Sequence, residues 1–178
     1  NQKKGLGQYK QQLSNLSYNN EVRIMNNIKI KRVSIEDIDQ LSIICRQTFY
    51  ETFSAGNTEE NMNKYLDEEL SIVKLTAEIN DENSETYIAT LDNLVIGYLK
   101  LNFGPSQTEL QDDSAIEVER IYTLKEYHGK GIGQILYNHV LEIARQKNTD
   151  YIWLGVWEEN PRAINFYKKN GFVAFDKH

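Results

Sequence analysis

A glycine-rich run between a strand-like and a helix-like segment is the part of the sequence best suited to chemistry. Residues 117–134 read EVERIYTLKEYHGKGIGQ, in which β-branched and aromatic residues lead into three alternating glycines. Glycine lets the backbone approach a ligand closely, and the amides and dipole at the start of a helix favour an anion. The run therefore predicts a site for a phosphate or pyrophosphate, held by the amides of Gly129, Lys130, Gly131, Ile132, Gly133 and Gln134.

The spacing of these glycines excludes two other phosphate-binding motifs. No GKS or GKT follows, as a Walker loop requires, and the run has neither the GxGxxG spacing nor the acidic ribose ligand of a dinucleotide fold. A glycine-rich turn that only starts a helix stays open as the alternative.

Two glutamates precede the glycines on the same expected strand. Because side chains alternate across a strand, we expect Glu117 and Glu119 to share one face, with Val118, Arg120 and Tyr122 on the other. A glutamate in a buried strand is costly unless it has a chemical role or a charged partner. Both residues are therefore candidates for chemistry, with an ion pair to a neighbouring lysine or arginine as the alternative.

Two sequence blocks resemble one enzyme family. HGKGIG, at residues 128–133, resembles the Q/R-x-x-G-x-G/A signature of the GNAT acetyltransferases, although His128 replaces the usual glutamine or arginine. IWLGVWEENPRAINFYKKNGF, at residues 152–172, resembles the strand and helix that close around pantetheine in that family. Within the family, this block together with ERIYT and NMNKYL is most similar to the bacterial PaiA-type spermidine/spermine acetyltransferases.

The resemblance implies direct transfer of an acetyl group from acetyl-CoA to an amine. Tyr167, in the FY pair, is implied to protonate the leaving thiolate, and a core tyrosine is the alternative. Glu119 is implied to take the proton from the ammonium, directly or through water, with Glu117 as a helper. Outside the glycine run, the resemblance implies cofactor contacts from the backbone groups of Ile121, Tyr122 and Thr123 and from the residues Asn160, Ala163 and Lys169. It also implies that the amide of Ile121 or of its neighbour binds the oxyanion. Asn160 also fits a helix cap and Lys169 a solvated lysine.

The acceptor is predicted from the charge of one segment. Residues 59–85 contain nine acidic and two basic residues. In GNAT enzymes this region belongs to the acceptor wall, and an acidic wall would attract a polyamine such as spermidine or spermine. A solvated helix face is the alternative explanation of the charge. Two other functions stay open: acetylation of protein N-termini or other small amines, and regulation by a protein that binds CoA without turnover.

The elements that must position these residues follow from apolar periodicity and turn residues. We expect the order β-α-α-β-β-β-α-β-α-β. The expected strands begin at Ile28 and continue at 87–91, 94–103, 115–123, 151–157 and 172–175. The expected helices follow Ser34, begin at Thr58 with a helical tendency that continues through 71–80, and cover 132–146 and 160–170. This order predicts an α/β GNAT fold with a mixed central sheet of six visible strands and helices on both faces. A seventh strand, which the family would add, is absent from the chain.

Length and composition narrow the class further. The 178 residues suit one domain, and a formal net charge of −6 argues against a broad basic face for nucleic acid. No apolar run suits a membrane span or a secretory signal. With a single cysteine, Cys45, these features predict a cytoplasmic protein.

Domain boundaries and partners complete the sequence-based expectations. Residues 1–24, rich in Asn, Gln, Lys and Gly, are interpreted as an extension or an added arm, and residues 25–178 as a single acetyltransferase domain. His128 and His139 lack a second ligand at metal-site spacing, so no metal is predicted. The sequence leaves a homodimer open.

Overall fold

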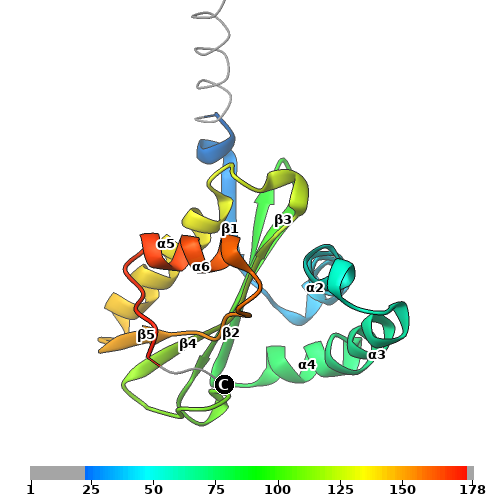
Figure 1. Ribbon diagram of the computed structural model, residues 1–178. Helices are drawn as coiled ribbons and strands as arrows, with labels where there is room; N and C mark the ends of the chain where they lie inside the picture. Colours follow the sequence, from blue (N-terminus) through cyan, green and yellow to red (C-terminus); the bar gives the residue numbers. More distant parts are fainter. Residues whose placement is uncertain (1–22, 176–178) are drawn as a thin grey trace, which may run out of the picture.

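The computed structural model describes residues 23–175 and is built around a five-stranded sheet (Figure 1). The strands stand in the order β1 (Ile28–Arg32), β2 (Ser84–Leu91), β3 (Leu94–Phe103), β4 (Ala115–Thr123) and β5 (Tyr151–Trp153). The first four strands pair antiparallel, and β5 pairs parallel with β4. The sheet is therefore mixed, as expected.

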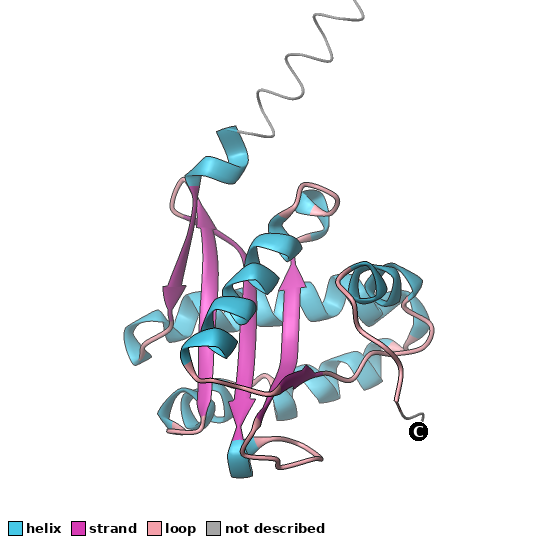
Figure 2. Ribbon diagram, turned by 90° about the vertical axis from the view of Figure 1, so that its left-hand side faces the viewer, coloured by secondary structure: helices cyan, strands magenta, loops and turns pink. Residues whose placement is uncertain are grey.

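Helices cover both faces of this sheet. The helices are α2 (Ile38–Phe53), α3 (Glu59–Glu69), α4 (Ile72–Asn80), α5 (Ile132–Gln146) and α6 (Pro161–Lys169). The first three lie on one side of the sheet and the last two on the other (Figure 1). Figure 2 views the second side, where α5 runs across the strands. Within residues 23–175, no helix is both long and apolar enough to cross a membrane.

The side chains of β3 divide the core between the two helical layers. A Cβ added at Gly97 would lie 3.4 Å from Cδ1 of Leu136 on α5, so Gly97 and the buried Leu99 and Leu101 face α5. Tyr98 alternates with them and contacts Cys45 of α2 on the other face. Both layers belong to one cluster of buried apolar residues.

Several turns and caps form where the sequence predicts them. Asp92 and Asn93 take positive φ values of 50° and 67°, which close the β2–β3 hairpin in two residues. The Asn160 side chain caps α6 by accepting a hydrogen bond from the Ala163 amide at 3.1 Å. Gly171 follows α6 with φ 89°, the left-handed conformation that ends many helices.

The expected strand count of six is not confirmed, because residues 172–175 are irregular. Val173 and Phe175 are 84% and 68% exposed, so the apolar residues that suggested a strand are not packed into the sheet. The strand expected at 151–157 ends at Trp153. A strand needs a hydrogen-bonded partner, which an apolar pattern does not reveal. The arm interpreted at residues 1–24 falls almost wholly outside the described residues, and residues 23–27 are helical.

Candidate active site

The edge of β4 that faces β5 is open over the second half of the strand. The two strands pair only from Ala115↔Tyr151 to Glu117↔Trp153. Beyond this point β5 ends, whereas β4 continues to Thr123 with β3 on its other side. The backbone groups left on the open side can bind an extended ligand as an added strand would. Ile121, Tyr122 and Thr123, predicted to contact pantetheine, all lie on this part of β4.

The glycine loop leads from the end of β4 into α5 and has the backbone geometry of an anion site. Gly129 and Gly131 adopt φ values of 74° and 83°, which side chains disfavour. Gly131 is the N-cap residue and has no side chain with which to satisfy the amides of the first turn, at Ile132, Gly133 and Gln134. A Cβ on Gly129 would meet nothing within 4 Å, so the loop has room for a ligand.

Two of the expected amide donors are bonded within the protein. The amide of Lys130 donates to the Tyr127 carbonyl oxygen at a long 3.4 Å. The amide of Ala163 donates to Asn160, whose side chain is thereby used as the helix cap. Lys169 is exposed on the last turn of α6.

Tyr167 of α6 lies near the end of β4. Its ring packs against Phe166 and Phe172, with centroid distances of 5.4 and 5.5 Å. Burial raises the pKa of Tyr167 well above its usual value, and the nearby Tyr122 hydroxyl raises it further, while Arg162 has the opposite effect. The Tyr167 phenol therefore carries its proton at neutral pH and is able to donate it.

The face assigned to Arg120 and Tyr122 by alternation is wrong, because β4 contains a bulge. Lys100 of β3 pairs with Arg120, and the next residue, Leu101, pairs with Val118. Glu119 is therefore the extra residue of the bulge and has no opposite residue on β3. One extra residue reverses the alternation beyond it. Arg120 and Tyr122 consequently share the face of Glu119, where the Tyr122 ring stacks beside Tyr98 at 5.9 Å.

The bulged Glu119 belongs to a buried network of four charges. Its carboxylate contacts Lys100 Nζ at 2.5 Å and Arg120 Nη2 at 3.0 Å. Glu78 of α4 accepts two bonds from Arg120, at 2.8 and 3.0 Å, and contacts Lys100 at 3.2 Å. Two carboxylates thus balance two cations. Sequence reasoning missed Lys100 and Glu78, since the register of β3 and the packing of α4 bring them together.

Glu119 is bound mainly by cationic side chains, whereas Glu117 accepts hydrogen bonds from neutral groups. Burial raises the pKa of Glu119, but Arg120, Lys100 and a hydrogen bond from Asn102 at 2.6 Å together lower it below its usual value. Glu117 is 3% exposed and accepts from Asn102 and from the amide and hydroxyl of Thr108. Glu119 is thus an ionised carboxylate at the cavity described next, whereas Glu117 is buried behind it.

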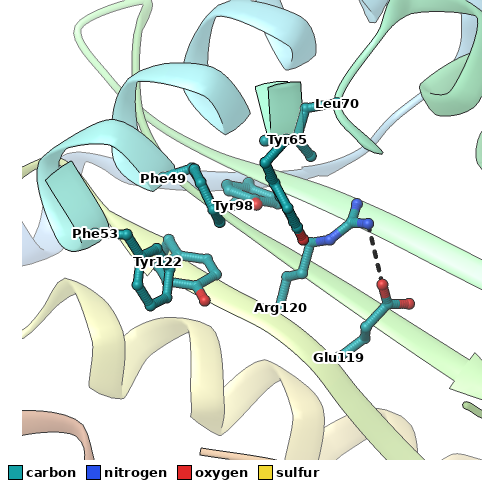
Figure 3. Close-up of a pocket in the computed structure, with 8 residues that line it drawn as sticks. All are labelled: Phe49, Phe53, Tyr65, Leu70, Tyr98, Glu119, Arg120 and Tyr122. Atoms are coloured by element: carbon teal, nitrogen blue, oxygen red, sulfur yellow. Dashed lines mark ion pairs between the residues drawn. The ribbon is translucent and has the colours of Figure 1, made fainter. Parts of the chain in front are cut away.

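A cavity of about 180 Å³ opens between α2, α3 and β4 (Figure 3). Its lining consists of Phe49, Phe53, Tyr65, Leu70, Tyr98, Glu119, Arg120 and Tyr122. Five of these eight side chains are aromatic, and the two charged ones pair with each other. Apart from Glu119 and Tyr122, sequence reasoning did not identify them as site residues. The signal for Tyr65 was its place in the NMNKYL segment, where helical spacing suggested only a packing role.

The acidic residues of segment 59–85 are not brought to this cavity. From that segment the lining takes Tyr65 and Leu70. Several of the acids are engaged elsewhere: Asp67 pairs with Arg46 at 3.0 Å, Glu69 with Lys74 at 3.5 Å, and Glu85 with Arg32 and Lys147 at 3.6 and 3.4 Å. The acidic residues of this segment therefore do not form the lining of the cavity, which is mainly aromatic.

His128, which departs from the family signature, lies between β4 and α6. Its Nε2 is 3.1 Å from the Thr123 carbonyl oxygen and 3.0 Å from Arg162 Nη2. Burial lowers the pKa of His128, and Arg162 lowers it further, so the neutral ring predominates at physiological pH. Within the part of the chain that the structure describes, no three His, Cys, Asp or Glu side chains gather to hold a metal ion.

Comparison with known proteins identifies a family and several relatives. The acetyltransferase (GNAT) family model matches residues 45–172. An uncharacterized N-acetyltransferase in the pepI 3′ region of Lactobacillus delbrueckii subsp. lactis is 38% identical over 154 residues, covering 86% of this chain and 89% of that protein. The spermidine N(1)-acetyltransferase of Thermoplasma acidophilum is 30% identical over 153 residues, covering 84% and 90% of the two chains.

Solved structures give the same result for the fold. The crystal structure of the PaiA N-acetyltransferase from Thermoplasma acidophilum in complex with coenzyme A superposes with a TM-score of 0.75 at 28% identity, covering 85% of this chain and 92% of that one. An aminoglycoside acetyltransferase from a soil metagenome superposes with a TM-score of 0.64 at 18% identity, covering 87% and 94% of the chains. At that identity the second likeness concerns the fold alone.

Proposed function

This chain belongs to the GNAT acetyltransferase family and is an acetyl-CoA-dependent N-acetyltransferase, and we propose that its acceptor is a primary amine of a polyamine such as spermidine or spermine. The observation that carries the proposal is the meeting of two features on one strand. The open edge of β4 at residues 121–123 lies next to a cavity that includes Glu119 and Tyr122 of the same strand.

The residues present fit acetyl-CoA, which supplies an acetyl group activated as a thioester. The open β4 edge suits the amides of pantetheine, and the left-handed glycines with the first turn of α5 suit its phosphates. Arg162, Lys168 and Lys169 of α6 add positive charge on the same side of the sheet. These groups offset the negative charge of the whole protein where the anion binds.

Glu119 and Tyr167 supply the two proton transfers. The acceptor nitrogen must lose a proton before its lone pair attacks the carbonyl carbon, and Glu119, kept ionised by its cationic neighbours, receives that proton through a water molecule. The carbon–nitrogen bond forms, the carbon–sulfur bond breaks, and the protonated Tyr167 gives its proton to the sulfur. A backbone amide of the β4 edge stabilises the negative oxygen that develops meanwhile.

The polyamine acceptor is supported by one relative whose name gives its acceptor. The Thermoplasma spermidine N(1)-acetyltransferase is 30% identical and covers 84% of this chain. The cavity of about 180 Å³ is close in size to the 150 Å³ cavities that hold a benzene ring. It therefore suits one aminopropyl or aminobutyl arm of a polyamine rather than a whole aminoglycoside.

The test is thiol release from acetyl-CoA against spermidine, spermine, putrescine, lysine and a short peptide, for the wild type and Tyr167→Phe. We expect turnover with the polyamines and a kcat lower by about 10²-fold or more in Tyr167→Phe, with an unchanged KM for the amine. Turnover confined to lysine or the peptide would overturn the polyamine acceptor. An unchanged kcat in Tyr167→Phe would remove Tyr167 as the acid.

A further inference from the structure

We infer that Tyr65 determines acceptor specificity, by holding on its ring face the second ammonium group of the acceptor while the reacting amine faces β4. The inference rests on the proposed polyamine function and names the residue that would select for it. Tyr65 enters the cavity from α3, whereas Glu119 and Tyr122 belong to β4 (Figure 3). Tyr65 therefore meets a different part of the acceptor from the nitrogen that reacts.

The ring of Tyr65 is fixed by packing and has one face available. It stacks on Phe49 with a centroid distance of 4.1 Å and an interplanar angle of 2°. Phe49 in turn packs on Phe53 at 4.7 Å. Because one face of Tyr65 is covered by Phe49, the other is left to the cavity and to solvent, and the residue remains 39% exposed. A rigid ring with an open face is the arrangement that binds alkylammonium ions.

The charged side chains of the cavity are already paired, so an aromatic ring face is left to bind the second ammonium group. Glu119, the carboxylate of the lining, already accepts from Lys100, Arg120 and Asn102. Arg120 is in turn neutralised by Glu78 of α4. A second ammonium entering the cavity thus meets a balanced set of charges, and ring quadrupoles provide the attraction that remains.

The experiment compares two acceptors of equal chain length. N-propyl-1,3-diaminopropane and n-heptylamine each have eight heavy atoms and differ in whether an NH₂⁺ or a CH₂ stands at one position. We expect the wild type to prefer the diamine in kcat/KM. Tyr65→Leu should raise the KM for the diamine by about 5- to 30-fold, as the loss of a cation–π contact implies, with little change for n-heptylamine. Tyr65→Phe keeps the ring and should keep the preference.

Controls separate this inference from the proposed function and from misfolding. Tyr50→Leu replaces a tyrosine of α2 that is 52% exposed and outside the cavity, and it should leave both amines unchanged. The melting temperature reports whether each variant is folded, and the KM for acetyl-CoA reports whether its cofactor site is intact; both should stay constant. Equal turnover of the two amines by the wild type, or equal effects of Tyr65→Leu on both, would overturn the inference alone. No turnover of the diamine, spermidine or spermine would overturn the polyamine acceptor as well.

Discussion

At the scale of single residues, Glu119 has the ion pairs that the sequence left open as an alternative, and its role as the base stays a proposal. It is paired with Lys100 and Arg120, and it also lines the cavity where an amine would react. The pairing lowers its pKa, which keeps the carboxylate ionised and makes it a weak base on its own. Such a group is better suited to receive a proton through water during the reaction than to hold it beforehand.

Lys100 should be essential to the stability of this network. Its side chain is 7% exposed and lies between Glu78 and Glu119, so Lys100→Met leaves two buried carboxylates with Arg120 alone. Removing one partner of a buried ion pair costs about 3–5 kcal/mol. We expect a loss of that size in the free energy of unfolding, measured by urea denaturation at pH 7.

The matched control is a second lysine in an exposed pair. Lys74 contacts Glu69 at 3.5 Å with both side chains more than 40% exposed, and exposed pairs contribute about 1 kcal/mol or less. Lys74→Met should therefore have a small effect. Comparable losses in the two variants would show that the four-charge network is not what stabilises β3 against β4.

At the scale of elements, the sequence predicted what is local and missed what depends on a partner. The cap of α6 by Asn160, the glycine after it and the two-residue hairpin turn depend on a few neighbouring residues, and all are confirmed. The bulge at Glu119 depends on the register between β3 and β4. The early end of β5 depends on how many of its residues pair with β4. No periodicity within one segment contains that information. Tyr65 shows the same limit for the site, because an apolar spacing cannot distinguish a core ring from a cavity wall.

The glycine loop gives a prediction at this scale. Gly131 precedes α5 with φ 83°, and an alanine there pays about 1–2 kcal/mol for the left-handed conformation or changes the loop. We expect Gly131→Ala to lower the melting temperature and to weaken coenzyme A binding, measured by thermal unfolding and calorimetry.

Gly133→Ala is the comparison for this prediction. Gly133 lies inside α5, and its added Cβ would meet Phe166 at an ordinary 3.8 Å. Alanine in a helix is more favourable than glycine by about 0.5–1 kcal/mol, so Gly133→Ala should be as stable as the wild type or more so. If both variants lost coenzyme A equally without a loss of stability in Gly131→Ala, the special backbone role of Gly131 would be refuted.

At the scale of the whole molecule, the proposed polyamine acceptor would meet the negative charge and the aromatic cavity at different stages of binding. The formal net charge of −6 attracts a polycation from a distance, and the acidic residues of segment 59–85 add to that field without lining the cavity. Electrostatic attraction of this kind increases the rate of encounter more than the final affinity. Salt should therefore slow association with a polyamine, whereas discrimination between amines should depend on the rings.

The carboxylates that the fold stabilises make the protein sensitive to acid. Burial raises the pKa of Asp81, but hydrogen bonds from Ser106 at 2.7 Å, the Asn83 amide at 2.8 Å and Ser84 lower it overall. The pKa values of Asp37 and Glu119 are lowered as well. Groups whose pKa is lower in the folded state add stability at pH values above their unfolded pKa of about 4, and that stability is lost as pH falls through the folded values.

We therefore expect the urea midpoint of unfolding to decline slightly from pH 7 to about pH 5, because the folded state disfavours protonation of His128 and His139, and to fall more steeply below about pH 5 as the carboxylates are protonated. Asp81→Asn removes one such group while keeping a similar shape. Its midpoint should be lower than that of the wild type at pH 7. The difference should narrow toward pH 3, because protonation of Asp81 in the wild type removes the same stabilising contribution. A difference that stayed constant with pH would mean that Asp81 stabilises the loop before β2 by its shape and hydrogen bonds alone, independently of its charge.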